Sequence, residues 1–71
     1  MVCVHRDATL IEACRLMRAC GISELMVVAE AEGRAEPIGK VSARDIAVRV
    51  VALELDPSVV TAGDLALVHE N

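Results

Sequence analysis

Apolar residues recur along the first third of the chain with the spacing of a helix. From Leu10 to Gly21 they fall three or four positions apart, and charged residues occupy the opposite face. Thr9 precedes this stretch and Glu12 follows Thr9 by three positions, which is the pattern of a capping box. Gly21 suits the left-handed residue that closes a helix. The pattern therefore predicts a helix from about Leu10 to Cys20.

Three shorter apolar runs predict strands. Residues 1–5 are apolar and β-branched enough for a short strand, and Leu25–Ala29 is apolar at every position, as in a central strand covered on both faces. The polar stretch 30–36 contains Gly33 and predicts a turn. Because Ile38–Val41 is apolar again, residues 24–42 predict a β-hairpin.

A second capping box, Ser42-Ala43-Arg44-Asp45, predicts a helix that runs to about Leu53 and that Pro57 helps to end. This helix carries two apolar stripes at helical spacing. The first stripe is Ala43, Ile46, Ala47 and Val50, and the second is Val48, Val51, Ala52 and Leu55. A helix packed only on its own sheet needs one stripe, so the second predicts a dimer interface. The alternative is that these are ordinary exposed apolar residues.

The order of elements predicts an α+β fold of βαββα type. The first two strands should be parallel through a right-handed crossover, and the hairpin adds an antiparallel third strand. We expect a three-stranded mixed sheet, covered by two helices on one face and paired with a second unit. Residues 2–56 are expected to form the domain. Residues 57–71 are expected to be a linker and the start of a following segment, with a short helical turn opening at Thr61-Ala62-Gly63-Asp64.

The composition also favours a partner. The chain has 71 residues, of which 55% are hydrophobic and none aromatic. A domain this small folds close to energetic break-even and cannot bury so much apolar surface internally. Exposed apolar patches usually mark interfaces, so we expect a dimer or tandem contact.

Charge and cysteine content argue against several classes of protein. The net charge is −4, and no basic cluster or aromatic ring is present for binding nucleic acid. No apolar run reaches the roughly 18 residues of a membrane helix, and no signal peptide is visible. Three cysteines fit no disulfide framework. A cytoplasmic protein is expected.

Two stretches of this sequence resemble a known family. Asp7-Ala8-Thr9-Leu10-Ile11-Glu12-Ala13, Met17, Gly21-Ile22-Ser23 and Val27-Val28 look like the first half of a CBS domain. Gly39-Lys40-Val41-Ser42-Ala43-Arg44-Asp45-Ile46 resembles its Gly–x–hydrophobic–Ser/Thr–x–x–Asp run. The resemblance covers residues 2 to about 55. Residues 60–67 look like the lead-in to a following repeat, although Ala66 and Leu67 stand where the family commonly has a methionine.

The resemblance implies a Bateman-type module of two repeats packed about a pseudo-two-fold axis. Such modules often bind AMP, ADP, ATP or S-adenosylmethionine in clefts between the repeats. This chain contains one repeat, so a complete module needs a homodimer or a second CBS repeat.

Ser42 and Asp45 are the strongest candidates for a nucleotide site. The Ser42 hydroxyl can donate to a phosphate, and the Asp45 carboxylate can accept from two ribose hydroxyls, roles that these positions have in the family by resemblance. Gly39 would let backbone come close, and Arg44 would pair with phosphates. The apolar slot for the adenine would consist of Cys3, Val4, Ile22, Leu25 and Ile38. The alternatives are an ordinary capping pair for Ser42 and Asp45, and core positions for the slot residues.

The sequence thus predicts a regulatory domain that senses an adenosine nucleotide, dimerises, and couples binding to a partner or attached domain. No cofactor is required for this role. The alternative is a purely structural dimerisation module without a small ligand. An enzyme is not expected, because no nucleophile–base constellation can be assembled. A metal site is not expected either, since Cys3-x-His5 supplies only two of the four ligands of structural zinc.

Overall fold

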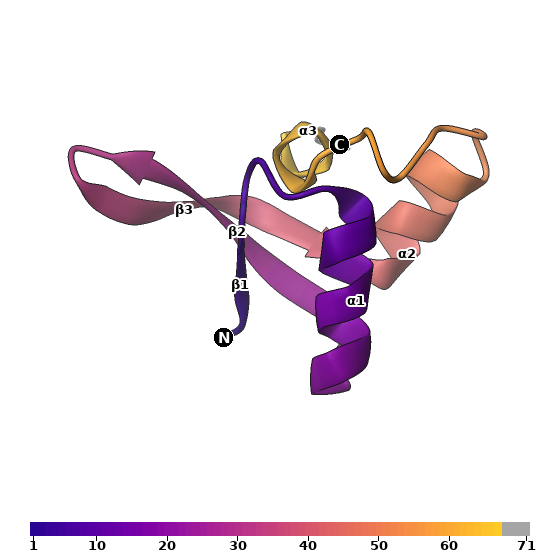
Figure 1. Ribbon diagram of the computed structural model, residues 1–71, viewed down its shortest axis with the longest axis horizontal. Helices are drawn as coiled ribbons and strands as arrows, with labels where there is room; N and C mark the ends of the chain where they lie inside the picture. The colour runs from indigo at the N-terminus through magenta and orange to yellow at the C-terminus, as the bar shows by residue number, and fades with distance from the viewer. Residues whose placement is uncertain (68–71) are drawn as a thin grey trace.

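The computed structural model describes residues 1–67 (Figure 1). The elements follow in the order β1 (Cys3–His5), α1 (Leu10–Cys20), β2 (Glu24–Ala31), β3 (Arg34–Ser42), α2 (Ala43–Ile46), η1 (Ala47–Val51) and α3 (Ala62–Ala66). The predicted βαββα order and the helical turn after it are confirmed. Of the predicted following segment, residues 68–71 lie outside the described residues.

Helix α1 begins and ends where the pattern predicts. The Thr9 hydroxyl accepts a hydrogen bond from the Glu12 N–H at 3.2 Å, and the Glu12 carboxylate accepts one from the Thr9 N–H at 2.8 Å. Gly21 closes the helix with a φ of 66°, in the left-handed region that favours glycine. Both ends are therefore determined by contacts local in sequence.

The sheet has the strand order β1-β2-β3, with β1 parallel to β2 and β3 antiparallel to it. The predicted turn over residues 30–36 is wrong in extent, because the strands continue to Ala31 and Arg34 and only Glu32 and Gly33 form the turn. Both turn residues have positive φ, 51° and 77°. Two such residues give the tight turn that matches the twist of a hairpin, and its backbone hydrogen bonds form regardless of side-chain polarity. Figure 1 shows this hairpin projecting beyond the helices.

The helices cover one face of the sheet. Leu25, Val27 and Ala29 are buried at alternate positions of β2, whereas Met26 and Val28 on the other face are only partly buried. The expectation that both faces of this strand are covered is therefore wrong for this chain, since all helices pack on the same face. The core cluster joins sheet and helices through Leu10, Ala13, Met17, Leu25, Val27, Val41, Ile46, Val50, Ala62, Leu65 and Ala66.

The segment predicted to be a linker contributes to that core. Its α3 packs beside the loop between β1 and α1, where the Ala62 N–H donates to the Ala8 carbonyl and the Gly63 N–H to the Arg6 carbonyl, both at 2.8 Å. Ala62 is fully buried and Leu65 nearly so. Residues 57–67 are thus attached to the domain, and the boundary at residue 56 stays a prediction.

The helix formed by α2 and η1 departs from regular geometry. After the single turn of α2, hydrogen bonds span five residues in η1, as from the Ala52 N–H to the Ala47 carbonyl at 2.9 Å. The helix ends at a turn in which Glu54 has a φ of 61°. Within residues 1–67, no helix has the length and apolar character needed to cross a membrane.

Candidate functional site

Ser42 and Asp45 form the capping box of α2. The Asp45 N–H donates to Ser42 Oγ at 3.0 Å, and the Ser42 N–H donates to Asp45 Oδ2 at 3.2 Å. The cap interpretation is thus realised. It uses a lone pair of the hydroxyl and one carboxylate oxygen, so the hydroxyl proton of Ser42 and Asp45 Oδ1 can still take part in other interactions. Both residues are partly exposed.

Sequence reasoning missed Arg49 as a neighbour of this pair. Its Nε lies 3.8 Å from Asp45 Oδ1, and its side chain is 24% exposed against 38% for that of Asp45. The signal was available, since residues four apart on a helix face each other and these two carry opposite charges. Arg44, the cation that we predicted for the phosphates, is exposed on the first turn of α2.

Gly39 permits a close approach of backbone, but the approaching chain is α3. A Cβ atom at Gly39 would lie 3.0 Å from the Ala66 carbonyl oxygen and 3.2 Å from the Ala66 Cβ. Glycine at this position therefore already has a packing role within the fold.

The residues predicted for the adenine slot do not lie on one surface. Leu25 is fully buried in the core, and Val4, Ile22 and Ile38 are partly buried against it. Cys3 is exposed and alternates with Val4 along β1, so it faces the opposite side of the sheet. Ile38 lies at the irregularity between the pairs Val27–Gly39 and Val28–Pro37.

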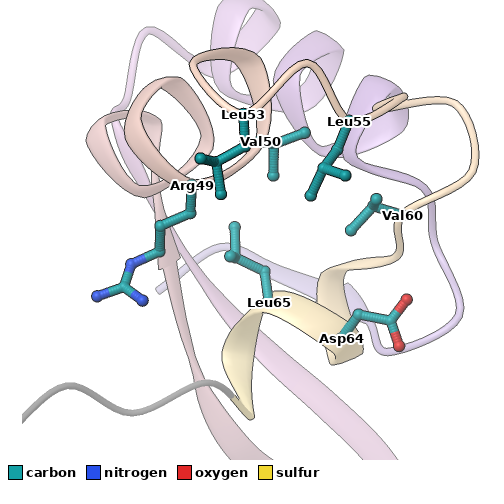
Figure 2. Close-up of a pocket in the computed structure, with 7 residues that line it drawn as sticks. All are labelled: Arg49, Val50, Leu53, Leu55, Val60, Asp64 and Leu65. Carbon is teal, nitrogen blue, oxygen red and sulfur yellow. The ribbon is translucent and has the colours of Figure 1, made fainter.

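A cavity of about 400 Å³ lies elsewhere, between the end of η1 and α3 (Figure 2). It is lined by Arg49, Val50, Leu53, Leu55, Val60, Asp64 and Leu65. Five of these seven residues are aliphatic, and the two charged residues stand on different sides of the cavity in Figure 2. Sequence reasoning did not find this cavity, because the two sides are brought together by the loop that contains Pro57.

The second apolar stripe, which was predicted as a dimer interface, lies on η1 and the turn after it and is exposed. Val48, Val51, Ala52 and Leu55 are all exposed to solvent, and Val51 is the most exposed of the three larger residues, at 60%. Leu55 also lines the cavity, so the stripe and the cavity are continuous. The predicted interface residues are therefore available for a partner.

Metal ligands are not gathered in the described part of the chain. Within residues 1–67, no group of three or more His, Cys, Asp or Glu side chains could hold an ion, and the three cysteines are free.

The clearest electrostatic feature is in the loop between η1 and α3. There, hydrogen bonds from the Ser58 hydroxyl and N–H lower the pKa of Asp56.

Comparisons with known proteins agree with this fold. The chain is 33% identical to Hypoxic Response Protein I, solved with two coordinated zinc ions, with a TM-score of 0.83 over 93% of this chain and 52% of that one. It is 28% identical to the CBS domain protein PAE2072 from Pyrobaculum aerophilum, complexed with AMP, with a TM-score of 0.77 over 92% of this chain and 47% of that one.

A putative signal-transduction protein with CBS domains from Burkholderia ambifaria MC40-6 is 26% identical, with a TM-score of 0.77 over 92% of this chain and 45% of that one. The chain thus spans about half the length of these three proteins. No curated protein matches it significantly. The family model for the CBS domain matches residues 1–52, most of the chain. On this match and the shared fold, the chain belongs to the CBS domain family.

Proposed function

We propose that this chain is a regulatory CBS domain that binds an adenosine nucleotide at Ser42 and Asp45 and pairs with a second CBS repeat. The observation that supports this most is the AMP complex of PAE2072, a protein of the same fold that is 28% identical over 92% of this chain. The similar structures include a putative signal-transduction protein with CBS domains, which supports a regulatory or binding role and not a catalytic one.

The proposed roles are compatible with the capping geometry of Ser42 and Asp45. Asp45 accepts from the ribose hydroxyls through its carboxylate, Ser42 donates its hydroxyl proton to a phosphate oxygen, and the exposed Arg44 pairs with the phosphate charge. Val4, Ile22 and Ile38 are partly buried and are kept as proposed contacts of the base. Leu25 is fully buried in the core, so it is not available to contact the base.

Regulation would follow from linkage between the two repeats. A nucleotide that contacts both repeats stabilises one relative orientation over others, and this bias passes to an attached domain or partner. The second repeat is either another copy of this chain or a further CBS repeat. A structural module that pairs without a ligand is the alternative.

Stability in the presence of nucleotides tests the proposal. At a hundredfold excess over its dissociation constant, a ligand that binds only the folded state adds about 2.7 kcal/mol to the free energy of unfolding. We expect thermal unfolding to shift upward with one or more of AMP, ADP, ATP and S-adenosylmethionine, and Asp45→Asn to abolish the shift. Asp64→Asn is the matched control, because Asp64 makes the same capping box with Thr61 at 3.1 and 3.2 Å.

The two capping variants separate binding from stability. Each is expected to cost roughly 1 kcal/mol or less, the worth of a helix cap. Only Asp45→Asn should remove the ligand response. If none of the four ligands stabilises the wild-type chain at millimolar concentration, the sensing function is wrong and the structural alternative takes its place.

Pairing through the exposed stripe gives a separate prediction. Val51→Glu places a charge in the middle of the stripe, and burying an unpaired charge is costly. We expect it to weaken dimerisation at least about tenfold, or about 1.4 kcal/mol, in sedimentation equilibrium. Val59→Glu is the control, because Val59 is exposed but lies in the loop outside the stripe. A wild-type chain that is folded and monomeric at micromolar concentration would contradict the homodimer.

A further inference from the structure

The two oxygens of the Asp45 carboxylate lie near different groups of the same helix. Oδ2 accepts the Ser42 N–H at 3.2 Å, and Oδ1 lies 3.8 Å from Arg49 Nε. A ribose presents two adjacent hydroxyl donors, and a carboxylate can accept one hydroxyl with each oxygen. In this structure one oxygen serves the cap and the other faces a cation. The guanidinium of Arg49 therefore lies beside the carboxylate oxygen that the cap does not use.

The side chain of Arg49 lies between the cavity and Asp45. Its side chain is 24% exposed, and it lines the apolar cavity together with Val50 and Leu65. Figure 2 shows the guanidinium directed away from the centre of the cavity, with the aliphatic part of the side chain at the cavity wall. The aliphatic part thus lies at the cavity wall while Nε lies 3.8 Å from Asp45 Oδ1, as is common for long cationic side chains. The contact between Arg49 and Asp45 is therefore made within the chain itself.

We propose that Arg49 is a positioning residue that competes with a ribose diol for Asp45 Oδ1 and so sets the affinity for ribose-bearing ligands. The inference rests on the proposed function, because it assumes that Asp45 accepts the ribose. It assigns to Arg49 a role distinct from that of Arg44: Arg44 attracts phosphate, whereas Arg49 lowers the availability of the carboxylate. Loss of Arg49 should therefore strengthen binding of a ribose that carries no phosphate.

Adenosine is the appropriate probe, since it has the diol but no charge for a lost arginine to attract. We expect Arg49→Met in the full chain to raise adenosine affinity about two- to fivefold in isothermal titration calorimetry, the factor that corresponds to a partly exposed ion pair. Methionine retains the apolar contact with the cavity. Arg49→Gln should act in the same direction. The control is Arg34→Met, which removes an exposed arginine at the hairpin tip and should leave affinity unchanged.

A second ligand distinguishes competition at the carboxylate from a general change in the fold. The compound 2′,3′-dideoxyadenosine lacks the diol, so its affinity should not respond to Arg49→Met. An equal gain for both ligands, or no gain for adenosine, overturns the role of Arg49 while the nucleotide function stands. If the wild-type chain does not bind adenosine and none of AMP, ADP, ATP and S-adenosylmethionine stabilises it, the proposed function itself is wrong, and the role of Arg49 falls with it.

Discussion

Replacing Leu25 with alanine is expected to lower the free energy of unfolding by about 3–5 kcal/mol. Leu25 is fully buried near the start of β2, the middle strand of the sheet, in the cluster that joins the sheet to the helices. Truncation removes buried methyl groups and leaves a cavity that rigid neighbours cannot fill. At about 0.1 kcal/mol per residue, a chain of 71 residues has a total stability of about 7 kcal/mol, so this one change removes about half of it or more.

Urea denaturation followed by circular dichroism measures the loss, since the chain has no Trp or Tyr for fluorescence. Leu53→Ala is the matched control, because Leu53 is 64% exposed and should cost no more than about 0.5 kcal/mol. If Leu25→Ala does not fold, Leu25→Val should still show a loss of about 1 kcal/mol. Equal losses at the two leucines would contradict the packing described above.

Leu25 also shows where sequence reasoning about the site stops. An apolar residue near a proposed nucleotide looks the same in sequence whether it lines a cleft or fills the core. The structure separates the cases: Leu25 points into the core, whereas Cys3 faces the opposite side of the sheet. The face of a strand residue depends on register, and register depends on pairing between segments distant in sequence.

Capping motifs, in contrast, were predictable because they are local. The three boxes that begin at Thr9, Ser42 and Thr61 all form as their sequences indicate, each within four consecutive residues. The five-residue hydrogen bonds of η1 and the length of the hairpin were not predictable in this way. Both arise from backbone geometry that cannot be deduced from the pattern of polar and apolar side chains. The cavity was missed for a related reason, since its walls come from segments on either side of the loop at Pro57.

Gly63→Ala is expected to have the second large effect, a loss of about 2–3 kcal/mol. A Cβ atom on Gly63 would lie 2.9 Å from both the Cβ atom and the carbonyl oxygen of Arg6. The same carbonyl accepts the Gly63 N–H at 2.8 Å, so the backbone cannot move apart without breaking that hydrogen bond. The methyl group therefore forces α3 away from the loop between β1 and α1. Leu67→Ala is the control, because Leu67 is exposed at the end of the same helix and should change stability by no more than about 0.5 kcal/mol.

The manner of unfolding in Gly63→Ala also tests where the domain ends. If residues 2–56 fold on their own, displacement of α3 should leave a folded remainder, and the chain should unfold in two steps. We expect a single cooperative transition at lower urea concentration, because Ala62, Leu65 and Ala66 share one core cluster with β2 and the other helices. A loss of less than about 0.5 kcal/mol in the free energy of unfolding would show that Arg6 can move aside for the added methyl group at little cost. Two separate transitions would place the boundary of the domain at residue 56 and make α3 an accessory segment.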